Sequence, residues 1–148
     1  MSLRCDSFSL CVPALTLVTL FLAAPGNATN AHDLSGSYSV INRTEAGSQL
    51  RVQMHVRLVN HSVERISVLK ITFLGSLPPT KPQGGAISIA LEPHRASKLT
   101  QELTITRQEY ELWQKGARPR LVLEIRRSDG TRRTDAIELY RSLGGEEK

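Results

Sequence analysis

The sequence predicts an all-β domain, a seven-stranded antiparallel sandwich with one short helix between the fifth and sixth strands, after an N-terminal signal peptide. Three observations predict it. Apolar and polar residues alternate over seven segments, turn residues separate most of these segments, and the first thirty residues contain an apolar run that ends in small residues. Alternation with a period of two is typical of half-buried strands, and many such strands at short spacing favour a sandwich or barrel over a doubly wound sheet.

The N-terminal segment has the features of a secretory signal peptide in the right order. Arg4 is the only basic residue before the apolar run Leu10–Ala24, and small residues follow. This order predicts a signal peptide over residues 1–28, with cleavage between residues 26 and 31. A membrane anchor needs about 20 apolar residues, whereas this run is shorter and contains Pro13. We therefore expect a secreted or periplasmic protein whose mature form has no membrane span.

Composition limits the classes of function. Both cysteines, Cys5 and Cys11, lie in the predicted signal peptide, so the mature chain would have no disulfide and no thiolate ligand. The remaining chain of about 118 residues can bury roughly 65% of its unfolded surface, which allows a core without disulfide or metal. The net charge is +5, but aromatic residues make up only 5%. Few aromatic side chains argue against nucleic acid as a partner, because single-stranded nucleic acid binds by stacking.

The clearest predicted strand begins at Leu50. Its apolar residues alternate strictly with polar ones: Leu50, Val52, Met54, Val56 and Leu58 against Arg51, Gln53, His55 and Arg57. We expect the first set to face the core. Similar alternation predicts six other strands, at Ser37–Asn42, Ile66–Leu74, Ala86–Leu91, Lys98–Thr106, Arg120–Arg127 and Arg132–Arg141. The domain then spans residues 34–141, and the polar, glycine-bearing tail 142–148 is expected to fray.

One short helix is predicted after the fifth strand. Thr106 and Glu109 have the spacing of a capping box, in which each side chain accepts a bond from the other residue's backbone N–H. Tyr110 and Trp113 are three residues apart and would face the sheet together. Gly116 would end the helix, because glycine readily takes the left-handed conformation that such ends require.

The last two strands are predicted to form a hairpin. The positions of their apolar residues decide whether its loop has an odd or an even number of residues. Leu121, Leu123 and Ile125 should face inward, and so should Ile137 and Leu139 on the returning strand. Opposed residues of an antiparallel pair share a face, so a two-residue Asp129-Gly130 turn would send Ile137 outward. A three-residue loop, Ser128-Asp129-Gly130, with Gly130 left-handed at a bulge, corrects the register.

Seven strands with a helix at this position resemble an immunoglobulin- or fibronectin type III-like sandwich. The resemblance covers Leu34 to Arg141 and is one of architecture only. The cysteine pair of antibody domains is absent, and the single Trp113 lies on the predicted helix and not on the third strand. The resemblance therefore implies a fold but assigns no functional residue.

No constellation of residues predicts catalysis, a metal or a cofactor. The candidate nitrogen ligands lack the close helical spacing and accompanying carboxylates of zinc sites: His32, His55, His61 and His94. The serines lack a Gly-x-Ser-x-Gly setting. Gly84 and Gly85 precede a predicted strand and not a helix, which excludes a phosphate loop and favours a long loop over Gly75–Gly85. We expect neither enzymatic activity nor a cofactor.

Arginine clusters at the turn of the last hairpin, where the candidate anion-binding residues are Arg126, Arg127, Arg132 and Arg133. Such a cluster attracts anionic partners such as envelope glycans or lipid headgroups. The alternative is a solvated tip that keeps a sheet edge from aggregating. Sequons begin at Asn27, Asn42 and Asn60, and they matter only in a eukaryotic secretory pathway.

Three functions are consistent with these observations. The first is an exported, non-enzymatic module that binds or scaffolds at the cell envelope, with an unknown partner. The second is an electrostatic binder of anionic envelope polymers through the arginine hairpin, which would show strongly salt-dependent binding. The third is an accessory domain that donates or accepts a strand, as pilus-type chaperones do, which requires a long and uncovered edge strand.

Overall fold

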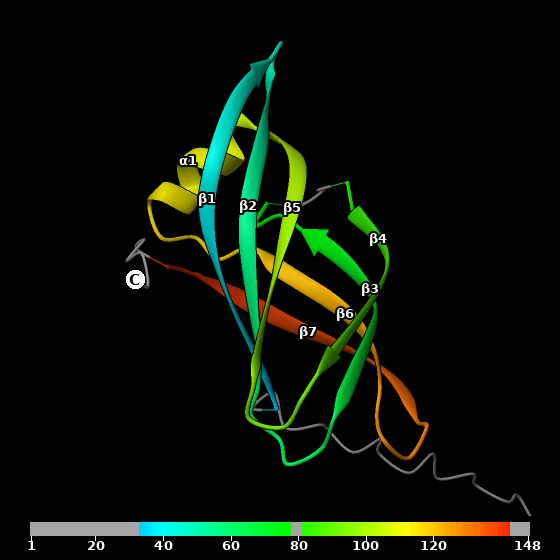
Figure 1. The fold of residues 1–148 in the computed structure, drawn as a ribbon. Helices are drawn as coiled ribbons and strands as arrows, with labels where there is room; N and C mark the ends of the chain where they lie inside the picture. Colours follow the sequence, from blue (N-terminus) through cyan, green and yellow to red (C-terminus); the bar gives the residue numbers. More distant parts are fainter. Residues whose placement is uncertain (1–32, 78–80, 143–148) are drawn as a thin grey trace, which may run out of the picture.

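The computed structural model describes residues 33–77 and 81–142, so the predicted signal peptide, His32 and nearly all of the predicted tail lie outside it. The described chain forms seven strands and one helix (Figure 1): β1 (Leu34–Ala46), β2 (Gln49–Asn60), β3 (Ile66–Leu74), β4 (Gln83–Leu91), β5 (Ala96–Thr106), α1 (Arg107–Gln114), β6 (Arg120–Arg126) and β7 (Arg132–Arg141). The prediction of an all-β fold with a single short helix after the fifth strand is confirmed.

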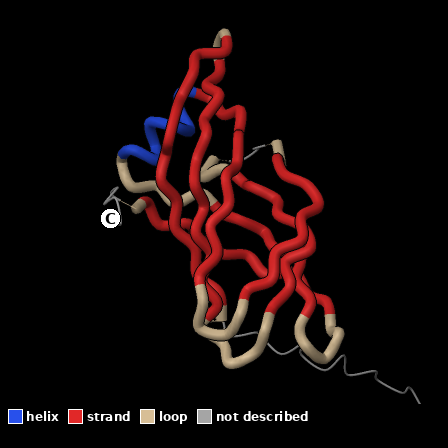
Figure 2. Tube along the Cα trace, viewed as in Figure 1, coloured by secondary structure: helices blue, strands red, loops and turns tan. Residues whose placement is uncertain are grey.

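Some strands are longer than the alternation predicts. β4 begins at Gln83, inside the segment predicted as a loop, and β1 continues to Ala46. Residues 41–49 are all exposed. Here the β1–β2 hairpin extends past β7, whose pairing with β1 stops at Tyr38, and only β5 accompanies β2 to Gln49 (Figure 2). Backbone pairing continues there to Ala46↔Gln49. None of these side chains is buried in the core, although Arg43 lies over the Tyr110 ring. The apolar alternation in the sequence therefore ends before the strand does.

All seven strands belong to one mixed sheet with the order β4-β3-β6-β7-β1-β2-β5. Neighbours pair antiparallel except β1 and β7, which pair in parallel from Gly36↔Leu139 to Tyr38↔Arg141. The prediction of a purely antiparallel arrangement is therefore wrong. Gly36 permits this contact, since a Cβ atom there would lie 2.5 Å from Cδ2 of Leu139. With the first and last strands joined, the sheet curls into a barrel-like shape.

The core is built by the alternating residues that the sequence indicates. Val52, Met54, Val56 and Leu58 of β2 are fully buried, and Leu50 is nearly so. Three aromatic rings pack edge to face at one end of this core. The ring centroid of Trp113 lies 5.7 Å from that of Tyr38 and 5.6 Å from that of Phe73. The predicted inward face of Trp113 and Tyr110 is thus confirmed.

The helix begins and ends as predicted, but one half of its capping box has another role. The Thr106 hydroxyl accepts a bond of 3.1 Å from the Glu109 N–H, and Gly116 takes φ +97°. The Glu109 carboxylate does not reach back to Thr106. It is buried, and it accepts bonds from the backbone N–H and hydroxyl of Ser76, from the Leu77 N–H and from the Trp113 indole. Glu109 therefore holds the chain after β3 against the helix.

The β6–β7 hairpin has the predicted parity. Leu121 lies opposite Ile137, and Leu123, Ile125 and Leu139 are fully buried. The three-residue loop is closed by a 2.9 Å bond from the Arg127 N–H to the Thr131 carbonyl, and Gly130 takes φ +85°. The same register sends Arg133 and Asp135 to the inner face, where Ile125 and Leu123 are their opposite residues.

Candidate functional site

Each histidine of the described chain either forms a hydrogen bond with a single hydroxyl group or lies in a turn. His55 bonds to the Thr100 hydroxyl at 3.1 Å, and His61 bonds to the Ser35 hydroxyl at 2.7 Å. Within residues 33–77 and 81–142, no group of three or more histidine, cysteine, aspartate or glutamate side chains is placed to hold a metal ion. Over the same residues, no helix has the length and apolar character needed to cross a membrane.

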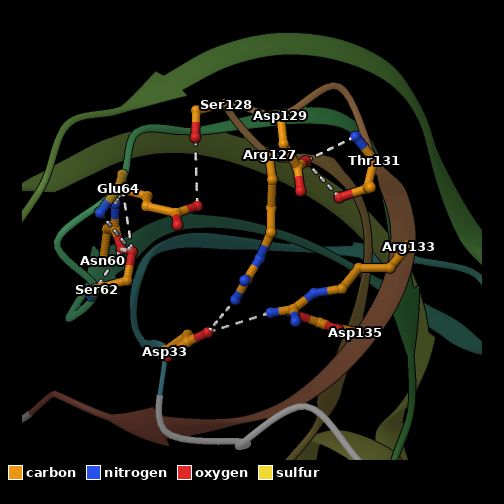
Figure 3. A network of polar contacts seen from close by, with 10 residues as sticks. All are labelled: Asp33, Asn60, Ser62, Glu64, Arg127, Ser128, Asp129, Thr131, Arg133 and Asp135. Atoms are coloured by element: carbon orange, nitrogen blue, oxygen red, sulfur yellow. Dashed lines mark hydrogen bonds and ion pairs between the residues drawn. The ribbon is translucent and has the colours of Figure 1, made fainter. Parts of the chain in front are cut away.

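The hairpin places the four candidate arginines on two different faces. Arg126 and Arg132 are directly opposite each other, and both are exposed on the outer face. Neither makes an ion pair with another described residue. Arg127 and Arg133 are only partly exposed, and both extend toward Asp33 at the start of β1 (Figure 3). The structure therefore brings the four residues to one hairpin, but as two exposed cations and two that are already paired.

The two inner arginines belong to an ion-pair network with two aspartates. The carboxylate of Asp33 lies 2.6 Å from the Arg127 guanidinium and 3.4 Å from that of Arg133. The Arg133 guanidinium also lies 2.9 Å from the Asp135 carboxylate, and both of these side chains are less than a fifth exposed. Partly buried ion pairs are screened less by salt than surface pairs. This network neutralises two of the predicted anion-binding residues and ties the start of β1 to the hairpin.

Further carboxylates reduce the positive potential at the hairpin tip. Asp129 accepts bonds from the hydroxyl and the backbone N–H of Thr131, and the hydroxyl bond is the main cause of the lowered pKa of Asp129. Its charge therefore persists over the ordinary pH range, next to the arginines. Glu64 also approaches the tip and accepts a 3.3 Å bond from the Ser128 hydroxyl. The anion-binding prediction thus rests on Arg126 and Arg132 alone.

Asn60 organises the neighbouring loops at the same end of the molecule. Its side chain is fully buried, and its amide donates to the carbonyls of Glu64, Leu91 and Glu92. Its oxygen accepts from the backbone N–H and the hydroxyl of Ser62. A glycan on this amide is incompatible with the fold, because it would replace one of the two buried N–H donors and would need space beside a fully buried side chain. The sequon at Asn42 is exposed and has no such restriction.

The two ends of the sheet order, β4 and β5, form the free edges. β5 has 11 residues and pairs with β2 in an unbroken register from Ala96 to Thr106. β4 pairs with β3 across a bulge between Val68 and Lys70. In Figure 1, β4 and β5 diverge after the loop that connects them. The unbroken edge of this sheet is therefore that of β5.

One side chain identifies which backbone groups of β5 face away from β2. The Gln83 amide donates to the Thr104 carbonyl and its oxygen accepts from the Thr104 N–H, both at 2.7 Å. Both backbone groups of Thr104 thus point to the free edge. Because these directions alternate along an antiparallel strand, the N–H and C=O groups of Lys98, Thr100 and Glu102 point the same way. This edge was missed by sequence reasoning, since alternation identifies strands but not their neighbours.

Comparisons with known proteins add no family. No family profile and no curated protein matches the sequence. A structure described as Northeast Structural Genomics Consortium target SoR45 is 8% identical, with a TM-score of 0.47 and coverage of 78% of this chain and 89% of that one. A protein from Archaeoglobus fulgidus is 15% identical, with a TM-score of 0.36 and coverages of 70% and 91%. At these values, neither similarity carries an argument about function.

Proposed function

We propose that this chain is an exported, non-enzymatic, immunoglobulin-like module that binds a protein partner at the cell envelope by accepting a strand along β5. The observation that carries the proposal is the unbroken β5 edge, where the backbone groups of Lys98, Thr100 and Glu102 face outward. An exposed row of this kind is a template for another strand. Main-chain bonds then supply affinity, and alternate side chains supply specificity.

The strand order supports the immunoglobulin-like part of this proposal. Immunoglobulin domains place strands A, B and E in one sheet and strands C, F and G in the other. Here β1, β2 and β5 would be A, B and E, whereas β3, β6 and β7 would be C, F and G. The parallel β1–β7 pair would join the two halves. No fourth strand then covers β5, which leaves this strand at an edge.

The proposal is tested by photocrosslinking in the native cell envelope. A benzoylphenylalanine in place of Thr100 would lie beside the free edge, and the same residue in place of Glu124 would lie on central strand β6 as the matched control. We expect a specific protein adduct from position 100 and none from position 124. Equal labelling from the two positions, or no adduct from position 100, would overturn the proposal.

A second candidate function is supported by the exposed pair Arg126 and Arg132. Like charges directly opposite each other are unfavourable on a sheet, and an anion would relieve their repulsion. The probe is heparin-agarose, with the salt concentration of elution as the measurement. Arg126→Ser/Arg132→Ser should elute at lower salt than Arg57→Ser/Arg95→Ser, which removes the same charge elsewhere. Equal elution of the two variants would leave the arginines only an anti-aggregation role.

A further inference from the structure

The free part of the β5 edge is short and has defined ends. At one end the Gln83 side chain occupies the outward backbone groups of Thr104. At the other end the chain turns into β4, and the Arg95 N–H donates to the Glu92 carbonyl within that turn. Ala96, Lys98, Thr100 and Glu102 remain between them. A strand that adds here therefore meets four residues with eight outward backbone groups, and the last three of these residues have polar or charged side chains.

These three residues form a charge pattern that is complementary to itself. Lys98, Thr100 and Glu102 are all exposed on the outer face of the sheet. Glu102 also lies 3.3 Å from Arg51 of its own chain, but more than half of its side chain stays exposed and can meet a second cation. In an antiparallel pairing of two identical strands, residues on either side of a central position face each other. With Thr100 at the centre, Lys98 lies opposite Glu102 of the partner subunit, and Glu102 lies opposite Lys98 of the partner subunit. Opposite charges and paired threonines across strands both stabilise a sheet.

We infer that the strand accepted by β5 is the β5 strand of a second copy of this chain, antiparallel, with Thr100 on the twofold axis. This inference rests on the proposed function and names the partner. Centring the pair on Lys98 or on Glu102 would place like charges opposite each other. Centring it on Thr100 makes all three residues hydrogen-bonded pairs, because their backbone groups already face outward. The charge pattern and the backbone directions therefore select the same register.

The other free edge does not offer an equivalent register. β4 has no charged residue between Gln83 and Leu91, so side-chain charges would not set its pairing with a second copy. The bulge opposite Val68 and Lys70 also interrupts its backbone row. A twofold β5 contact is isologous and uses all three polar or charged residues of this edge. It therefore closes at two copies and removes the edge from further strand addition.

Charge reversal in the purified mature chain tests the inference, with the dimer dissociation constant from sedimentation equilibrium as the measurement. Lys98→Glu would place two glutamates opposite each other at both contacts, and Glu102→Lys would do the same with two lysines. We expect each single variant to weaken the dimer by about tenfold or more. An equimolar mixture of the two variants should form heterodimers, and the double variant Lys98→Glu/Glu102→Lys should recover wild-type association.

The matched control reverses a charge pair that lies away from this edge. Lys70 and Glu124 form an ion pair between β3 and β6, 3.3 Å apart, and Lys70→Glu/Glu124→Lys should leave the dissociation constant unchanged. A wild-type chain that stays monomeric, or single variants that dimerise like it, would overturn the inference. In that case a crosslink from position 100 to another protein would leave the proposed function standing. The absence of both dimer and crosslink would refute the two together.

Discussion

Asn60 shows how a single buried polar side chain can hold several loops. Its amide and its oxygen satisfy backbone groups of Glu64, Leu91, Glu92 and Ser62. A buried polar group is stabilising when its hydrogen bonds are complete, and costly when one partner is removed. The side chain therefore joins the β2–β3 loop to the end of β4, although Asn60 lies in a glycosylation sequon, which predicts an exposed asparagine.

Asn60→Asp is expected to lower the free energy of unfolding by about 2 kcal/mol or more. The aspartate would lose both amide donors and set a carboxylate against three carbonyl oxygens. Urea denaturation followed by circular dichroism measures the change. Asn42→Asp is the control, because Asn42 is exposed, and it should change the free energy of unfolding by less than about 0.5 kcal/mol. Similar losses from the two variants would contradict the role assigned to Asn60.

Gly130→Val should destabilise the domain by more than about 1 kcal/mol, since a β-branched residue is strained at positive φ. Gly130 has φ +85°, but no atom lies within 4 Å of the Cβ position. The cost is thus conformational and not steric. Gly130→Asn should cost less, because asparagine tolerates the left-handed region better. Thermal denaturation compares the two variants, and an equal loss would show that the loop does not need this conformation.

The arginines show what residue type alone cannot predict. Arg126 and Arg127 are adjacent in the sequence, yet one is exposed and the other is bonded to Asp33. The parity of the hairpin could have assigned Arg133 to the inner face, because it shares a face with Ile137. Its partner Asp33 lies 100 residues away in the sequence. Only the pairing of β1 with β7 brings the aspartate to the hairpin.

At the scale of elements, alternation predicts strands and their faces but not their neighbours. The inward faces of β2 and β6 follow directly from apolar residues at every second position, and that of β7 follows from Ile137 and Leu139. The sequence pattern does not show whether two paired strands run parallel or antiparallel, because side chains alternate with the same period in both. The parallel β1–β7 contact depends on Gly36, whose missing Cβ makes room for Leu139. A glycine within a strand is consistent with such close approach but does not identify the partner.

The register of β2 predicts opposite outcomes for two adjacent substitutions. Val56→Asp should prevent folding or cost several kcal/mol, because Val56 is fully buried and an unpaired carboxylate there would be desolvated. His55→Asp should be tolerated, since His55 lies on the outer face of the same strand and bonds only to a surface hydroxyl. Soluble yield and urea denaturation measure both. Comparable losses from the two changes would mean that the register is wrong.

At the scale of the whole molecule, the start of the described chain holds the first strand and the last hairpin together. The first strand lies between β7 and β2 in the sheet, and Asp33 immediately before it accepts bonds from two arginines. The sequence predicts cleavage between residues 26 and 31, because a short apolar run is followed by small residues. All of these positions precede Asp33, so the predicted processing would leave the ion-pair network complete.

We expect the secreted protein to begin between residues 27 and 32, because the apolar run is short and ends in small residues. Intact-mass spectrometry of the protein from its native host measures the start. Leu17→Arg should block export and leave the precursor unprocessed, since a charge in the middle of the apolar run abolishes its hydrophobic character. Asp33→Asn should be exported and cut at the same place, but should unfold at a lower temperature because Arg127 and Arg133 lose their shared carboxylate. An intact Met1, or a lipid on a cysteine, would contradict the prediction of a cleaved signal peptide.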